Sequence, residues 1–214
     1  MNSRPRVLLA DDHRLVAEAL KRMLAEEFDL VGVVEDGLAL IDAARELRPD
    51  VVIADIAMPR LNGLDALPHL KKDNPGLKVV FLTMHKDAAY ARRALESGGS
   101  GFVLKHSAPA ELTDAIHAVL SGKTYLTPTL AGEVMDAVRR DPASTGGPLS
   151  QLTPRQREIL QLLAEGRSAK EIGAVLGISA RTVEFHKYQM MASLGLHANA
   201  ELVHFAIKHG LVSI

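Results

Sequence analysis

Polar side chains that could do chemistry follow short apolar runs in the first half of this 214-residue chain. Asp11 and Asp12 follow the run RVLLA, Asp55 follows VVIA, Thr83 ends KVVFLT, and Lys105 ends GFVLK. A carboxylate inside a buried strand is costly unless it is neutralised or paired. At the carboxyl end of a parallel strand it instead faces the crevice in which open α/β sheets bind ligands. We therefore interpret these side chains as one candidate site.

The chemistry that suits this set is phosphoryl transfer onto a carboxylate. Three converging carboxylates repel one another unless they are protonated or bridged by a cation, and hard oxygen ligands favour Mg²⁺. A hydroxyl and an ammonium can hold phosphoryl oxygens, and such reactions depend mainly on positioning and charge neutralisation. Taken singly, the Asp pair is more often a helix cap, Thr83 a turn residue and Lys105 a surface charge. Their coincidence at successive strand ends favours the site.

The elements that must position these side chains alternate between strands and helices. Between the apolar runs lie segments with apolar residues at helical spacing, which predicts βαβ units and a parallel sheet with helices on both faces. Pro68 lies within the third helical segment and predicts a kink or a late start there. The apolar runs occupy residues 6–11, 29–34, 51–55, 78–83 and 101–105.

The second half of the chain has a different pattern. A linker is expected over 123–149, with one helix at about 128–140, and its RDPASTGGPLSQ stretch is rich in Gly, Pro and Ser. Beyond it, Thr153 and Ser168 begin two capping boxes, which predict helix starts. The chain therefore divides into two domains.

Composition limits the class of protein. There is no cysteine, which excludes disulfides and thiolate metal sites. No stretch approaches the roughly 18 apolar residues of a membrane helix, so we expect a cytoplasmic protein without a membrane partner. From residue 150 onward seven Lys/Arg stand against five Asp/Glu, which permits a nucleic-acid role without requiring one.

Residues 168–187 have the pattern helix, tight turn, helix. A polar face on the second helix is what a major-groove recognition helix needs, although a plain helical hairpin for protein contacts fits the pattern equally well. The apolar side chains spaced to form a shared core are Ile172, Leu176, Ile178, Val183, Met190 and Leu194. The opposite face of the second helix carries Arg181, Glu184, Phe185, Tyr188 and Ala192.

Residues 5–122 resemble the receiver domain of bacterial two-component response regulators. The resemblance rests on DDH, on D-x-x-MP-x-x-x-G from Asp55 to Gly63, on LT and on GFVLK. It implies an α/β fold, with a doubly wound five-stranded parallel sheet in the order 2-1-3-4-5, and Asp55 as the phosphoacceptor. Gly99 stands where alanine is usual and Ala17 where arginine is frequent, and neither departure touches the chemistry.

The same resemblance implies roles for the other crevice residues. Thr83 and Lys105 would bind the phosphoryl group, and Phe102 would be the aromatic residue of the switch. The implied Mg²⁺ ligands are Asp11, Asp12, Asp55 and the backbone carbonyl of Ala57.

Residues 152–212 resemble the LuxR-type, or NarL/FixJ-type, helix-turn-helix domain, a small all-α domain assigned here to 150–213. The resemblance implies that the helix at about 199–209 is the dimer contact and that an unphosphorylated receiver can mask the recognition helix. His186 is interpreted as a packing or phosphate-contact residue and not as a metal ligand. The DNA-binding residues so predicted are Arg181, Thr182, Glu184, Phe185, Lys187, Tyr188 and Gln189.

Together the two resemblances predict a transcriptional regulator that is not an enzyme beyond its own phosphorylation and dephosphorylation. A sensor histidine kinase would phosphorylate Asp55, which would promote homodimerisation and binding to a double-stranded DNA operator. An aspartyl-phosphate hydrolase would need a second Asp two residues after the nucleophile, where this chain has Ala57. A constitutive DNA binder with an inactive receiver is disfavoured because the crevice residues are intact.

Overall fold

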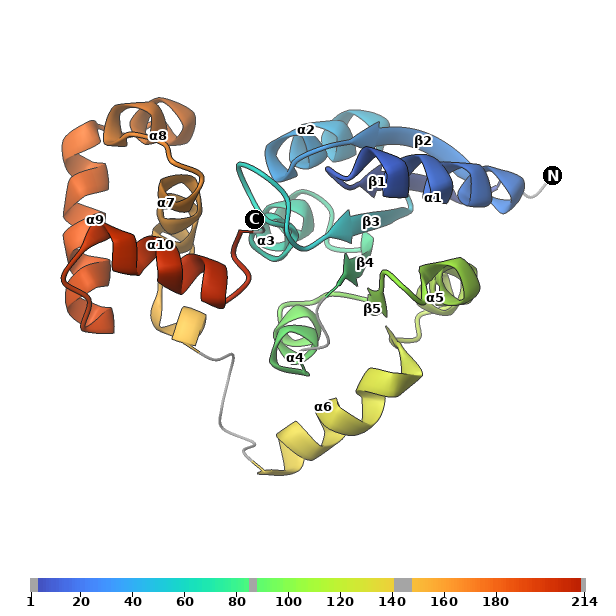
Figure 1. The fold of residues 1–214 in the computed structure, drawn as a ribbon. Helices are drawn as coiled ribbons and strands as arrows, with labels where there is room; N and C mark the ends of the chain where they lie inside the picture. The colour runs from blue at the N-terminus through green and yellow to red at the C-terminus, as the bar shows by residue number, and fades with distance from the viewer. Residues whose placement is uncertain (1–3, 85–87, 141–147, 213–214) are drawn as a thin grey trace.

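The computed structural model describes residues 4–84, 88–140 and 148–212, which form an α/β domain followed by a helical domain (Figure 1). Within these ranges, no helix combines the length and apolar character needed to cross a membrane. Residues 141–147, near the end of the predicted linker, lie outside the described part of the chain.

The α/β domain is built on a parallel sheet in the order β2-β1-β3-β4-β5-β6. The predicted five strands and their order are confirmed, and burial explains their apolar runs, since every residue of β3 and β5 is buried. A sixth strand, only two residues long, lies in the segment that the sequence assigned to the linker, too short to show a strand pattern. The strands are β1 Arg6–Ala10, β2 Asp29–Val34, β3 Val51–Asp55, β4 Lys78–Thr83, β5 Gly101–Leu104 and β6 Tyr125–Leu126.

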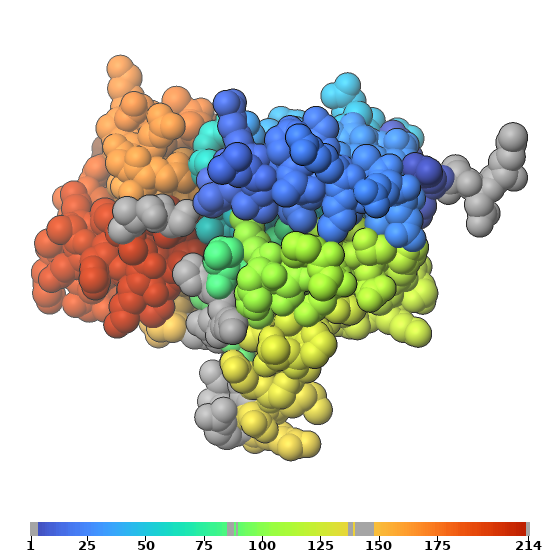
Figure 2. All heavy atoms as spheres, turned by 45° about the vertical axis from the view of Figure 1, so that its right-hand side comes forward, coloured from blue at the N-terminus to red at the C-terminus, as the bar shows by residue number. Residues whose placement is uncertain are grey.

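Helices cover both faces of the sheet, as the βαβ pattern predicts. Helices α1 and α5 pack on one face, while α2, α3 and α4 pack on the other. Helix α6 packs against α4 and projects from the domain, as Figure 2 shows in yellow. The helices are α1 Arg14–Glu27, α2 Gly37–Leu47, α3 Gly63–Asp73, α4 Ala88–Glu96, α5 Ala108–Leu120 and α6 Pro128–Arg140.

Helix α3 begins earlier than its proline suggested. It starts at Gly63 and runs through Pro68, so of the two predicted alternatives the late start is wrong and the kink stays a prediction. The side chain of Asn62 caps the helix by accepting a hydrogen bond from the Asp65 N–H at 2.9 Å, and such a cap fixes where a helix begins. A Cβ atom added at Gly63 would lie 2.3 Å from the carbonyl oxygen of Asp55, so only glycine lets the helix start this close to the end of β3.

The helical domain has its own apolar core. Both predicted capping boxes are present, at Thr153 and Ser168. Of the predicted core, Ile172, Val183 and Met190 are fully buried, whereas Leu176, Ile178 and Leu194 pack around them partly exposed. The elements are a 3-10 helix η1 Pro148–Gln151, then α7 Pro154–Ala164, α8 Ala169–Leu176, α9 Ala180–Leu194 and α10 Asn199–Lys208.

Candidate functional site

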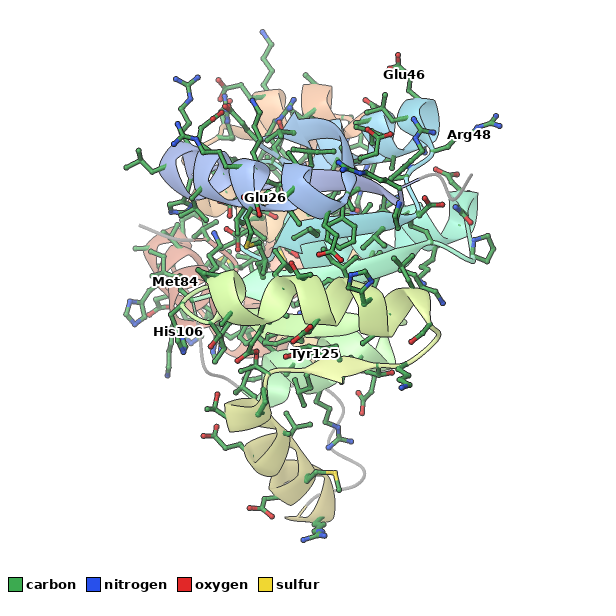
Figure 3. All side chains as sticks on the ribbon, turned by 90° about the vertical axis from the view of Figure 1, so that its right-hand side faces the viewer. Glu26, Glu46, Arg48, Met84, His106 and Tyr125 are labelled. Atoms are coloured by element: carbon green, nitrogen blue, oxygen red, sulfur yellow. The ribbon has the colours of Figure 1, made fainter. Side chains whose placement is uncertain are left out.

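The parallel register brings the predicted crevice residues to one edge of the sheet. Asp11 and Asp12 follow β1, Asp55 and Thr83 are the last residues of β3 and β4, and Lys105 follows β5. In the ladder Asp55 is paired with Leu82, and Thr83 with Leu104, so these strand ends are level. The chain continues from β4 and β5 into Met84 and His106, which lie at the same edge in Figure 3.

The centre of the site is an ammonium between two buried carboxylates. The Lys105 Nζ lies 2.7 Å from Asp55 Oδ2 and 2.8 Å from Asp11 Oδ2. The side chains of Asp11, Asp55 and Lys105 are 0, 4 and 5% exposed. The Ala57 N–H donates to Asp55 Oδ1 at 3.3 Å. Backbone and ammonium together therefore fix the orientation of the Asp55 carboxylate.

Burial and charge act in opposite directions on these groups. Burial raises the pKa of the Asp55 carboxyl, Lys105 lowers it and Asp11 raises it, and the net pKa is about 6. Burial lowers the pKa of the Lys105 ammonium, but the attraction of Asp55 and Asp11 outweighs it, so the net pKa is raised. Lys105 is therefore a cation at neutral pH. Asp55 is mainly an anion at this pH, but burial destabilises its ionised form relative to the protonated form.

The donor atoms at this edge fit a hard divalent cation. Ligand atoms of Asp11, Asp12, His13 and Asp55 lie within 4.8 Å of one another. Three carboxylates face a single ammonium, which leaves two negative charges unbalanced, and carboxylate oxygens are the ligands that Mg²⁺ prefers. His13 was not among the predicted site residues. Its Nδ1 lies 2.9 Å from Asp12 Oδ1. Its position directly after the Asp pair is the sequence signal that could have identified it.

The two predicted switch residues are both buried. The Thr83 side chain ends β4 at the same edge as Asp55 and is 3% exposed. Phe102 is fully buried in the core cluster that also contains Ala91 of α4 and Leu130 of α6. In this arrangement the aromatic ring occupies an inward position.

The predicted DNA-reading residues lie on one helix, α9, after a short turn. Gly177 ends α8 in the left-handed region, with φ 67°, and Ser179 caps α9 by accepting from the Thr182 N–H at 3.0 Å. Phe185 and Tyr188 are 58 and 64% exposed. Of the remaining positions, Arg181 and Gln189 are exposed, Thr182, Glu184 and His186 are partly exposed, and Lys187 is buried.

Lys187 is paired within its own helix. Its Nζ lies 2.5 Å from Glu184 Oε2 and 5.2 Å from the centre of the Tyr188 ring. The i,i+3 spacing permits this pair, but nothing in the sequence shows which of several partners a lysine adopts. The pair cancels much of the positive charge that α9 presents.

Helix α9 lies on the side of its domain that faces away from the α/β domain, while α7 and the chain after α10 face it (Figure 1). The implied masking of the recognition helix is therefore not the arrangement of the described residues. The residues that join the domains were missed by sequence reasoning, since Arg157, Gln161 and Glu165 of the α7 region look like an ordinary polar helix face.

Comparison with known proteins finds one family in the α/β domain and another in the helical domain. Residues 7–117 match the family "Response regulator receiver domain", and residues 150–206 match "Bacterial regulatory proteins, luxR family". The chain is 38% identical to the transcriptional regulatory protein MctR of Rhizobium johnstonii, over 100% of this chain and 99% of that protein. It is 33% identical to the response regulator UvrY of Escherichia coli, over 96% of this chain and 94% of UvrY.

A solved structure matches nearly the whole chain at a lower sequence identity. RcsB of Salmonella enterica serovar Typhimurium, bound to a promoter in the presence of the phosphomimetic BeF3-, is 28% identical with a TM-score of 0.65. The match covers 96% of this chain and 100% of that one.

Removing the charge of Asp55 should stabilise the metal-free protein. Because burial raises the pKa of this carboxyl from 3.8 to about 6, the folded state binds its proton more tightly than the unfolded state does. The free energy of unfolding that depends on this group therefore falls as pH rises from about 4 through 6. We expect Asp55→Asn to be more stable than wild type by about 2–3 kcal/mol at pH 7.5 in EDTA, and by less at pH 5.

Thermal unfolding of both proteins at the two pH values measures this difference. Asp114→Asn, an exposed change on α5, is the matched control and should leave stability nearly unchanged. A destabilised Asp55→Asn protein at pH 7.5 would contradict the account of the buried charge.

Proposed function

This chain belongs to the response regulators that join a receiver domain to a LuxR-type helix-turn-helix domain, and from that membership we propose that phosphorylation of Asp55 controls its binding to DNA. The observation that carries the proposal is the contact of the Lys105 ammonium with Asp55 Oδ2 at 2.7 Å, beside the Asp11 carboxylate. A buried carboxylate with a cationic neighbour at the mouth of a crevice can act as a nucleophile and still have its product charge neutralised.

The receiver residues then have distinct roles. Asp11, Asp12, Asp55 and the Ala57 carbonyl would hold Mg²⁺, which would supply charge neutralisation for the phosphoryl oxygens. An Asp55 oxygen forms the new bond to phosphorus while the bond to the donor breaks. Lys105 moves its ammonium from the carboxylate to a phosphoryl oxygen, and the Thr83 hydroxyl donates to another. The phosphoryl group thereby holds the Thr83 side chain, while the Phe102 ring is already buried without it.

The partners follow from the two domains. The donor is a sensor histidine kinase, the phosphorylated chain forms a homodimer, and the dimer binds a double-stranded operator. RcsB, bound to a promoter with a phosphomimetic, supports this order of events by similarity. Moving the receiver from mostly inactive to mostly active takes about 5 kcal/mol of preferential stabilisation of the active state by the phosphoryl group.

On α9 we assign the residues to two kinds of contact. Arg181 and Lys187 contact phosphates, while Tyr188 and Gln189 bond base edges, and Glu184 accepts from a cytosine amine. Thr182 and Phe185 complete the same face. Because Lys187 Nζ lies 2.5 Å from Glu184 Oε2, the two side chains have to separate before both can contact DNA. This cost makes a single domain a weak binder.

Asp55 should be the sole phosphorylated residue. Incubation of the full chain with acetyl phosphate and Mg²⁺ should add one phosphoryl group by intact mass, because Asp55 combines the last position of a strand with the ammonium and metal partners, whereas Asp11 lies beyond the end of β1. Asp114→Asn, the matched removal of an exposed carboxylate, should be modified like wild type. An Asp55→Asn protein that still gains a phosphoryl group would disprove the assignment.

Added positive charge at the end of α9 should strengthen DNA binding. Ser193 and Asn199 stand where this family usually has Lys and Arg, and Ser193 is exposed. Ser193→Lys should add up to about one unit per monomer to the slope of log affinity against log salt, since each phosphate contact releases about one counterion. Ser193→Gln, of similar length without charge, is the control.

Two DNA duplexes serve as probes in this measurement. The first is a sequence that the phosphorylated protein selects from a random pool, and the second carries one half of that sequence. Binding to the full sequence should be far tighter than binding to the half, because a dimer holds two weak domains together. Equal affinity for both, or an unchanged slope in Ser193→Lys, would count against this assignment.

A further inference from the structure

A glutamine of the DNA-binding domain holds the loop that follows the phosphoacceptor. Gln161 of α7 is fully buried. Its Nε2 donates to the Met58 carbonyl at 2.7 Å, and its Oε1 accepts from the Asn62 N–H at 2.8 Å. One amide thus bridges both ends of the 58–62 loop. That loop begins directly after Ala57, whose carbonyl is the proposed metal ligand.

A carboxylate of the same domain stands at the mouth of the acidic site. Glu165 Oε1 accepts from the Arg60 N–H at 2.8 Å and from Gln161 Nε2 at 3.0 Å. Glu165 and Val212 line a pocket of about 100 Å³ together with Asp12, Ala57, Met58 and Pro59. The DNA-binding domain therefore supplies part of the wall around the site.

A buried ion pair fixes the same contact at α3. Asp65 Oδ1 lies 2.7 Å from Arg157 Nε of α7 and 3.0 Å from Arg93 Nη2 of α4, and its side chain is 2% exposed. The Asp65 Oδ2 also accepts from Asn62 Nδ2 at 2.7 Å. Removing one partner from such a buried pair is strongly destabilising. The contact is therefore specific, and it connects α4 and α7 through one carboxylate.

We call the DNA-binding domain seated while its helix α7 is packed on the α/β domain through these contacts. We propose that Gln161 and Glu165 are positioning residues of the phosphorylation site, through which the seated DNA-binding domain opposes phosphorylation of Asp55. The inference rests on the proposed function of Asp55. Phosphorylation replaces a single negative charge by about two, and Glu165 adds a further negative charge at the mouth of a poorly solvated site. Gln161 holds the loop in the shape of the unmodified state.

Coupling between two equilibria is reciprocal. If the seated domain disfavours phosphorylation, phosphorylation weakens the seating of the domain by the same factor. Because Phe185 and Tyr188 are exposed while α7 is seated, the regulated event is release of the domain for pairing with a second copy, rather than uncovering of α9.

Three variants of the full chain separate the effect of charge from the effect of seating. Gln161→Ala removes the hydrogen bonds of the Gln161 side chain to Met58 and Asn62. Glu165→Gln removes the charge but keeps the oxygen that accepts from Arg60 and Gln161. Glu46→Gln removes the same charge from an exposed position on α2 (Figure 3) and is the matched control. The readouts are the rate of phosphorylation by acetyl phosphate with Mg²⁺, followed by intact mass, and amide exchange of the 58–62 loop without any phosphoryl donor.

In the Gln161→Ala protein the amides of the 58–62 loop should exchange faster than in wild type. The same protein should be phosphorylated roughly fivefold faster than wild type or more, which is within the usual range of coupling energies. Glu165→Gln should keep the loop protected and still be phosphorylated faster than wild type, and Glu46→Gln should match wild type in both readouts. An unchanged or lower rate in Gln161→Ala overturns the inference whatever the loop does, and so does a Glu165→Gln rate equal to that of Glu46→Gln. If wild type itself gains no phosphoryl group on Asp55, the proposed function fails instead.

Discussion

The contact of Lys105 with the carboxylates of Asp55 and Asp11 is the interaction on which the chemistry of the site depends. Both carboxylates are almost completely buried, and a buried charge without a partner is strongly destabilising. One ammonium cannot balance three carboxylates, so the edge of the sheet keeps an excess of negative charge around Asp12. That imbalance is what suits the site to a divalent cation, and it explains why the charge of Asp55 is held at a cost. A phosphoryl group with its cation changes this balance at one point of the fold.

A short series of contacts connects Asp55 with the DNA-binding domain. Asp55 ends β3, and the loop from Met58 to Asn62 is held by the amide of Gln161 from α7. Asp65, at the start of α3, holds Arg93 of α4 and Arg157 of α7 together. A change at the strand end can therefore reach the second domain through a loop and one ion pair. Helix α9 takes no part in this path, because it lies on the outer side of its domain (Figure 1).

The residues that sequence reasoning located are those whose environment is set locally. Apolar runs define the strands, and in a parallel sheet their ends must meet, so Asp11, Asp55, Thr83 and Lys105 could be grouped from sequence. The two-residue strand β6 could not be found, because two residues show no periodicity. The partners of Gln161 lie about 100 positions away, at Met58 and Asn62. No local pattern distinguishes such a buried polar side chain from an exposed one on the same helix face. The early start of α3 before Pro68 depended on the cap at Asn62 and the close approach of Gly63 to Asp55.

A crystal structure of the full chain with Mg²⁺ and beryllofluoride tests the account of the site most directly, because beryllofluoride stands in for a phosphoryl group on a carboxylate. The account predicts beryllofluoride on the Asp55 carboxylate, in contact with Lys105 and Thr83. It also predicts a metal ion bound by Asp11, Asp12, Asp55 and the Ala57 carbonyl. Beryllofluoride bound elsewhere, or a Lys105 ammonium that stays on the Asp55 and Asp11 carboxylates while the metal site is full, would contradict it.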